Sequence, residues 1–135
     1  MKSILIIGLI VLCNFLVDCK KENPKIYSTS LVGEWSWIKS CGGIAGICYT
    51  PESTKSNSKI VFTPDSTYKF YRNDTLKISS CFSVNRNLSI DNVQTATITY
   101  CFSSVQQTIK ISHDTLFLND GCCDGFSSSY KRVKY

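Results

Sequence analysis

The eight cysteines are the residues of this chain that could do the most chemistry, because a thiol can form a disulfide, bind a metal or carry a covalent group. Zinc sites built on sulfur usually contain two closely spaced cysteines together with further cysteines or histidines. No C-x2-C pair occurs, and His113 is the only histidine. The pattern therefore favours disulfides over zinc, and we expect no metal and no cofactor.

The first eighteen residues are typical of an export signal. Lys2 supplies a basic start, and residues 3–17 are almost wholly apolar. A run of about fifteen residues matches the apolar part of a signal peptide and is shorter than the ~20 residues that a spanning helix needs. An uncleaved membrane anchor is the alternative, and Asn14 and Asp18 argue against it. We expect a signal peptide over 1–18, a charged flexible tether over 19–30 and one domain over 31–135.

The end of this segment, Leu16-Val17-Asp18-Cys19, resembles a bacterial lipobox. Lipoboxes have an apolar residue three positions before the cysteine and a small residue directly before it, and Asp18 departs from the second feature. The resemblance implies that Cys19 Sγ is diacylated, that the chain is cut before Cys19 and that the new amino group is acylated. Two or more acyl chains anchor stably, whereas a single chain binds only marginally. Cys13 is the competing candidate, but it leaves a shorter apolar run and has no polar tether behind it.

By analogy with lipoprotein sorting, Lys20 directly after the lipidated cysteine points to the outer membrane. We therefore expect a cell-envelope protein that meets the membrane through its lipid anchor. The formal net charge of +5 is modest and dispersed, so we expect no nucleic-acid partner.

Six cysteines remain for the exported domain, and an even number in a small exported domain indicates a disulfide framework. They are Cys41, Cys48, Cys81, Cys101, Cys122 and Cys123. Cys41 and Cys48 flank the glycine-rich segment Gly42-Gly43-Ile44-Ala45-Gly46, which is flexible enough to close on itself. Cys81 and Cys101 lie on the more polar faces of two alternating segments, and a hairpin turning near Asp91 would place them opposite one another.

The adjacent Cys122 and Cys123 have no assigned pairing. A bridge between neighbouring residues is strained, and separate partners would change the whole scheme. Their connectivity stays open.

Alternation of apolar and polar residues recurs along the whole exported part, and no segment has a helical stripe. Turn residues such as Pro64-Asp65-Ser66, Asn73-Asp74 and His113-Asp114 separate the alternating segments. An antiparallel up-and-down meander of about eight short strands can close into an all-β barrel, which removes exposed sheet edges. The expected strands are Leu31–Lys39, Ser58–Thr63, Thr67–Arg72, Thr75–Val84, Thr95–Ser103, Gln107–Ser112, Thr115–Asn119 and Ser128–Lys134.

Gly33-Glu34-Trp35 resembles the G-x-W signature of lipocalins, and Arg132 matches the basic residue that packs over this tryptophan in them. Such a cation–π contact contributes about 0.5–2 kcal/mol. Further segments resemble small lipocalin-like lipoproteins of the bacterial envelope: Gly42 to Gly46, Thr50-Pro51-Glu52-Ser53, Phe62-Thr63-Pro64-Asp65, and Asp124-Gly125-Phe126 followed by Tyr130-Lys131-Arg132. The resemblance implies a lipocalin-like barrel with an apolar interior. The chain departs from it in lacking a T-D-Y motif and in its many cysteines.

Catalytic constellations are missing from the sequence, and we expect no enzyme. A hydrolase triad needs a histidine beside a nucleophile and an acid, whereas His113 falls in an expected turn. No G-x-S-x-G, H-E-x-x-H, P-loop or G-x-G-x-x-G motif occurs. Gly42, Gly43 and Gly46 indicate a loop with positive φ or close packing. Asp120 and Asp124 are an alternative Ca²⁺ site, although their spacing fits no EF-hand.

Aromatic residues on the alternating segments either fill the barrel or line a ligand cavity. The candidates for lining are Trp37, Tyr68, Phe70, Tyr100 and Phe102. We expect an envelope-anchored lipoprotein whose barrel is a binding or interaction module for a small apolar ligand or a protein partner. A structural lipoprotein with a filled barrel and no ligand is the alternative.

Overall fold

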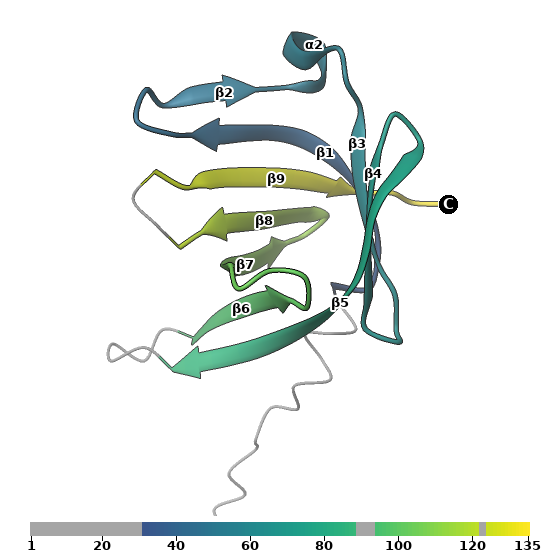
Figure 1. The fold of residues 1–135 in the computed structure, drawn as a ribbon, viewed down its shortest axis with the longest axis vertical. Helices are drawn as coiled ribbons and strands as arrows, with labels where there is room; N and C mark the ends of the chain where they lie inside the picture. Colours follow the sequence, from purple (N-terminus) through teal and green to yellow (C-terminus); the bar gives the residue numbers. More distant parts are fainter. Residues whose placement is uncertain (1–30, 89–93, 122–123) are drawn as a thin grey trace, which may run out of the picture.

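The alternating segments form the strands of one antiparallel sheet in the computed structural model, which describes residues 31–88, 94–121 and 124–135 (Figure 1). A short helix, α2 (Pro51–Thr54), lies between the second and third strands. The strands are β1 (Gly33–Gly42), β2 (Ile47–Tyr49), β3 (Ser58–Phe62), β4 (Thr67–Arg72), β5 (Thr75–Leu88), β6 (Gln94–Tyr100), β7 (Gln106–Ser112), β8 (Thr115–Asp120) and β9 (Phe126–Arg132).

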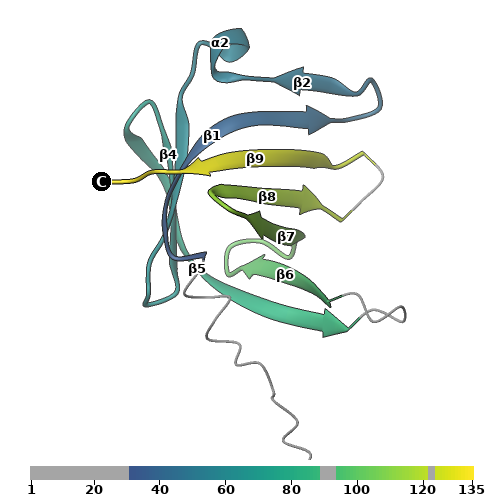
Figure 2. The ribbon, with the colours of Figure 1, turned by 180° about the vertical axis from the view of Figure 1, so that it is seen from behind.

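The sheet closes on itself because β1 pairs with β9 as well as with β3. Within the described ranges, β1 and β3 to β9 make an eight-stranded up-and-down barrel, as expected for a lipocalin-like fold. The first half of β1 pairs with β3 through residues 33–36, and its second half pairs with β2 through residues 40–42. β2 and β3 therefore lie along different halves of β1, and Figure 2 shows β2 beside β1 from behind.

The long strand β5 turns one corner of the barrel. Its residues 75–81 pair with β4, and its residues 82–88 pair with β6. One continuous strand thus belongs to both walls, and it curves between them in Figure 1.

The core fills the barrel with side chains that alternate along each strand. Trp35, Ile60, Phe62 and Leu116 are almost completely buried, and the rings of Phe62 and Phe82 meet edge to face with centroids 5.0 Å apart. Burying a side chain of this size contributes about 1.5–3 kcal/mol. The remaining buried apolar residues are Leu31, Ala96, Ile98, Tyr100, Ile109 and Leu118.

All eight expected strands are present, Thr67–Arg72 with the expected bounds and the other seven with shifted ends. Two elements, β2 and α2, were not expected. The strand β2 has three exposed residues, and α2 has four residues, so neither is long enough to show a period. The helix begins at a capping box in which Thr50 Oγ1 accepts from the Ser53 amide and Ser53 Oγ accepts from the Thr50 amide. The helix lies within the connection from β2 to β3, residues 50–57.

Leu76 lies two positions before Ile78, so the alternation of this segment predicts the same face for both, but Leu76 is 47% exposed. The register between β4 and β5 shifts at this point: Phe70 pairs with Ile78, but the next residue, Tyr71, pairs with Leu76. An extra residue in one strand reverses the alternation beyond it. Ile78 therefore keeps its expected face and Leu76 does not.

The expected signal peptide, lipobox cysteine and tether (residues 1–30), the turn near Asp91, and Cys122 and Cys123 lie outside the described residues. In residues 31–88, 94–121 and 124–135, no helix combines the length and apolar character needed to cross a membrane.

Candidate functional site

The residues of the G-x-W signature meet where the first and last strands close the barrel. The guanidinium Cζ of Arg132 lies 4.0 Å from the centre of the Trp35 ring, as the resemblance implies. Arg132 Nη1 donates to the carbonyl oxygen of Val32 at 2.9 Å, and Trp35 Nε1 donates to that of Leu31 at 2.9 Å. Gly33 has a φ of +138°, and a Cβ atom there would lie 2.8 Å from Arg132 Nη1. The role of these residues is therefore structural, since their contacts join the first and last strands of the barrel.

The structure contains both of the disulfides that the sequence predicts. Cys41–Cys48 joins β1 to β2 with Cα atoms 4.0 Å apart, and Cys81–Cys101 links β5 to the residue after β6 with Cα atoms 5.3 Å apart. The Cys101 amide also donates to the Cys81 carbonyl oxygen at 3.0 Å. The hairpin arrangement expected for β5 and β6 is therefore correct.

The glycine-rich loop between β1 and β2 has the conformations that its sequence predicts. Gly43 and Gly46 have φ values of +73° and +60°, and the Gly46 amide donates to the Gly43 carbonyl oxygen at 3.0 Å. At Gly42 the reason is close packing, since a Cβ atom would lie 2.8 Å from the Cα of Phe126. The loop is shaped by its disulfide and by β9, and it lacks the residues of a phosphate site.

A cavity of about 360 Å³ lies among β1, α2, β3, β4 and β9. Aromatic rings from three strands, hydroxyl groups and one guanidinium group line it. The lining residues are Trp37, Ser40, Thr54, Ser56, Ser58, Phe70, Arg72 and Tyr130. We call this the α2 cavity.

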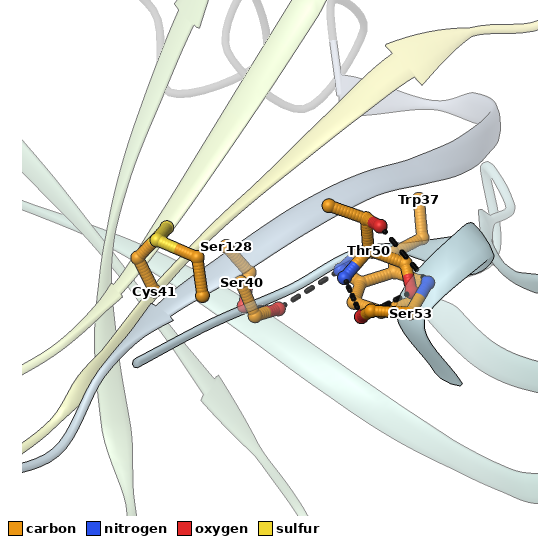
Figure 3. Close-up of a disulfide and its surroundings, with 7 residues drawn as sticks. Trp37, Ser40, Cys41, Thr50, Ser53 and Ser128 are labelled. Atoms are coloured by element: carbon orange, nitrogen blue, oxygen red, sulfur yellow. Dashed lines mark hydrogen bonds between the residues drawn. A yellow bond between two sulfur atoms is a disulfide. The ribbon is translucent and has the colours of Figure 1, made fainter. Parts of the chain in front are cut away.

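A bulge in β1 determines which side chains reach the α2 cavity. Trp37 pairs with Tyr130, but the register shifts before Lys39, and Ser40 then pairs with Ser128. Because the shift adds one residue, Trp37 and Ser40 both face the interior although they are three positions apart in the sequence. Trp37 Nε1 donates to Ser40 Oγ at 2.9 Å, and Ser40 Oγ lies 2.7 Å from Ser128 Oγ (Figure 3). The disulfide at Cys41 is next to this group in the same picture.

A smaller cavity of about 220 Å³ lies on another side of Tyr130, which lines both cavities. Its polar side is a chain of hydrogen bonds: Tyr100 Oη donates to Gln107 Oε1 at 2.9 Å, and Gln107 Nε2 donates to Asp120 Oδ1 at 2.8 Å. The other lining residues are Tyr68, Phe102, Ser103, Val105 and Leu118.

Asp120, an alternative calcium ligand in the sequence, accepts hydrogen bonds from the protein with both of its carboxylate oxygens. Its Oδ1 accepts from Gln107, and its Oδ2 accepts from the Phe126 amide at 3.0 Å. Over the described residues, no group of three or more histidine, cysteine, aspartate or glutamate side chains is placed to hold a metal ion.

Burial moves the ionisation of the interior tyrosines to higher pH. It raises the pKa of Tyr68 and of Tyr100 well above the ordinary value, and it raises the pKa of Tyr130 to about 12. At neutral pH these phenols therefore act as uncharged rings with hydroxyl groups.

The structure divides the five candidate lining residues between the two cavities. Trp37 and Phe70 line the α2 cavity, whereas Tyr68, Tyr100 and Phe102 line the smaller one. Phe102 lies in a turn after β6, where a strand was expected, and is 54% exposed. His113 is exposed in the turn between β7 and β8 with a φ of 53°, as the sequence indicates.

Six lining residues of the α2 cavity were not among the candidates. The two-residue period of a strand predicts the interior positions of Ser58 and Arg72. Ser58 shares a face with Ile60 on β3, and Arg72 shares a face with Phe70 on β4. Ser40 depends on the bulge, and Thr54 and Ser56 depend on the fold of the segment after β2. Tyr130 belongs to the segment Tyr130-Lys131-Arg132 of the resemblance, which does not indicate that its side chain lines a cavity.

In comparisons with known proteins, no family model matches the chain, and no curated protein matches it.

Proposed function

We propose that this protein is an envelope-anchored lipoprotein whose lipocalin-like barrel binds a small, largely apolar ligand in the α2 cavity. The observation that carries the proposal is the cavity itself, about 360 Å³ in volume with Trp37, Phe70 and Tyr130 on its walls. Small-molecule sites have volumes of about 300–1,000 Å³ and are lined mainly by apolar and aromatic side chains with a few polar groups. The α2 cavity belongs at the lower end of that range, so the ligand is small.

A binding role suits the groups that face the cavity, which are rings, hydroxyls and one guanidinium. Anchoring is proposed from the sequence, through the signal-like residues 1–18 and lipidation of Cys19. The membrane would then be the first partner, a small apolar molecule the second, and nucleic acid would not be a partner.

A structural lipoprotein without ligand is the second candidate function. The tightly packed core around Trp35, Phe62 and Phe82 favours it, because that part of the barrel is filled. The two candidates differ in whether the α2 cavity is occupied in the cell.

Native mass spectrometry of the protein purified from its own host tests the proposal. We expect a co-purifying small molecule, and we expect Ser58→Phe to lose it, because the new ring would occupy the cavity. Ser79→Phe is the matched control, since Ser79 is exposed on β5 and pairs with Lys69 outside the cavity. A protein that carries no adduct in either form would favour the structural role.

A further inference from the structure

We infer that the ligand of the α2 cavity has an anionic head group joined to an apolar body, with Arg72 and Ser56 binding the head. This inference rests on the proposed function and names the chemical class of ligand for the same cavity. It begins with the charge of the lining: Arg72 is the only charged side chain among the described residues that line the cavity.

Arg72 is placed toward the cavity by the alternation of β4. Tyr68 and Phe70 pack against the core, and Arg72 lies two residues further on the same face, at the end of the strand. Its Cζ is 5.8 Å from the centre of the Phe70 ring. The guanidinium group thus lies at the mouth of the cavity and against one of its walls.

No carboxylate neutralises this guanidinium in the part of the chain that the structure describes. The closest acid in sequence, Asp74, lies 3.9 Å from Lys59 Nζ, Glu34 pairs with Lys59, and Asp114 pairs with Lys134. A planar guanidinium with free N–H donors binds carboxylate or phosphate through paired hydrogen bonds. The cavity therefore offers one positive charge that an anionic ligand would neutralise.

Ser56 supplies a second polar group. Its Oγ is buried and has no hydrogen-bond partner, although Ser56 lines the cavity. Two other lining hydroxyls already have partners in the protein: Ser40 Oγ bonds with Trp37 and Ser128, and Thr54 Oγ1 donates to the Thr50 carbonyl oxygen at 2.9 Å. Buried hydroxyls are normally paired, so Ser56 is the one whose partner a ligand atom would supply.

The rest of the ligand must be apolar and small. Trp37, Phe70 and Tyr130 present rings to the cavity, and the Tyr130 phenol carries no charge at neutral pH, where its pKa of about 12 is far from the ambient pH. Carboxylic acids and phosphate esters share the chemistry that this lining would recognise, an oxyanion next to an apolar group.

Equilibrium dialysis with 2-naphthoate and 2-naphthamide tests the inference. The two probes share one ring system and differ in the charge of the head group. The full-length protein is used in detergent micelles, with the same micelles in the opposite chamber to cancel partitioning. We expect 2-naphthoate to bind about tenfold more tightly than 2-naphthamide, as charge-assisted hydrogen bonds to Arg72 imply.

Variants assign the preference to the two residues. Arg72→Leu should remove it while leaving 2-naphthamide affinity within about twofold, and Arg72→Lys should keep part of it. Lys69→Leu is the matched control, because it removes a positive charge from the opposite face of the same strand. Ser56→Ala should weaken 2-naphthoate binding several-fold without lowering the melting temperature, since the lost hydroxyl has no partner in the protein.

The outcomes separate this inference from the proposed function. Equal affinity for the two probes, or a preference that survives Arg72→Leu, overturns the anionic head group and leaves the cavity as an apolar site. No binding of either probe, or binding that Ser58→Phe leaves unchanged, overturns the α2 cavity as the site altogether. A third probe, 2-naphthyl phosphate, distinguishes a carboxylic acid from a phosphate ester as the ligand. Whichever of 2-naphthoate and 2-naphthyl phosphate binds more tightly identifies the head group.

Discussion

Arg132 lies over the face of Trp35, with its Cζ atom 4.0 Å from the centre of the ring, and Gly33 leaves the space for its guanidinium group. The contact joins β1 to β9, the two strands that close the barrel. It links residues that are almost a hundred positions apart in the chain.

We expect Gly33→Ala to destabilise the protein by about 1–3 kcal/mol. The new Cβ would lie 2.8 Å from Arg132 Nη1, and the φ of +138° suits glycine alone. Gly121→Ala is the matched control, because a Cβ there would meet only the Gln106 carbonyl oxygen at 3.8 Å. Urea denaturation of both variants measures the difference, and equal midpoints would contradict the role given to Gly33.

The two disulfides should stabilise unequally. Cys81 and Cys101 are 20 positions apart, and Cys41 and Cys48 are 7 apart, so the first bridge removes more freedom from the unfolded chain. We expect the double change Cys81→Ser with Cys101→Ser to lower the melting temperature more than Cys41→Ser with Cys48→Ser. Scanning calorimetry ranks the two variants. Peptide mapping without reduction should recover Cys81 joined to Cys101, and a link from Cys81 to Cys122 or Cys123 would refute this pairing.

Cys19→Ser should abolish lipidation. If Cys19 Sγ carries the diacylglycerol, the variant accumulates as an uncleaved or soluble species that incorporates no labelled palmitate. Metabolic labelling of the wild type and of Cys13→Ser provides the comparison, since Cys13→Ser should label normally. Labelling that persists in Cys19→Ser and disappears in Cys13→Ser would move the anchor to Cys13.

Stability should fall as the pH rises from about 10 to about 12, in part because of Tyr130. Burial raises its pKa from 10.0 in the unfolded chain to about 12 in the folded protein, so above pH 10 the unfolded state loses its proton first. The contribution is fully present below pH 10 and is lost as the pH passes through the folded pKa. Tyr130→Phe should flatten this part of the profile in urea titrations, and an unchanged slope would show that Tyr130 does not titrate in this way.

Much of the barrel can be predicted from the sequence, because strands and turns are specified by residues that are close together in the chain. Successive side chains of a strand point to opposite faces, so the period-two pattern predicts strands such as Thr67–Arg72 directly. Turn residues are equally local: Asn73, Asp74 and His113 all have positive φ where turns were expected. The pairing of Cys81 with Cys101 also follows, since one short hairpin sets their register.

The tertiary structure alone decided which side chains share the α2 cavity. The bulge between Trp37 and Lys39 brings Ser40 to the interior face, and nothing in the alternation of β1 marks that extra residue. Ser56 reaches the cavity through the path of the chain after β2, and Trp37 and Tyr130 come together there because β9 pairs with β1. A repeating pattern specifies the face of a strand, but register shifts and barrel closure depend on contacts between residues far apart in the chain, and those contacts exist only once the fold has formed.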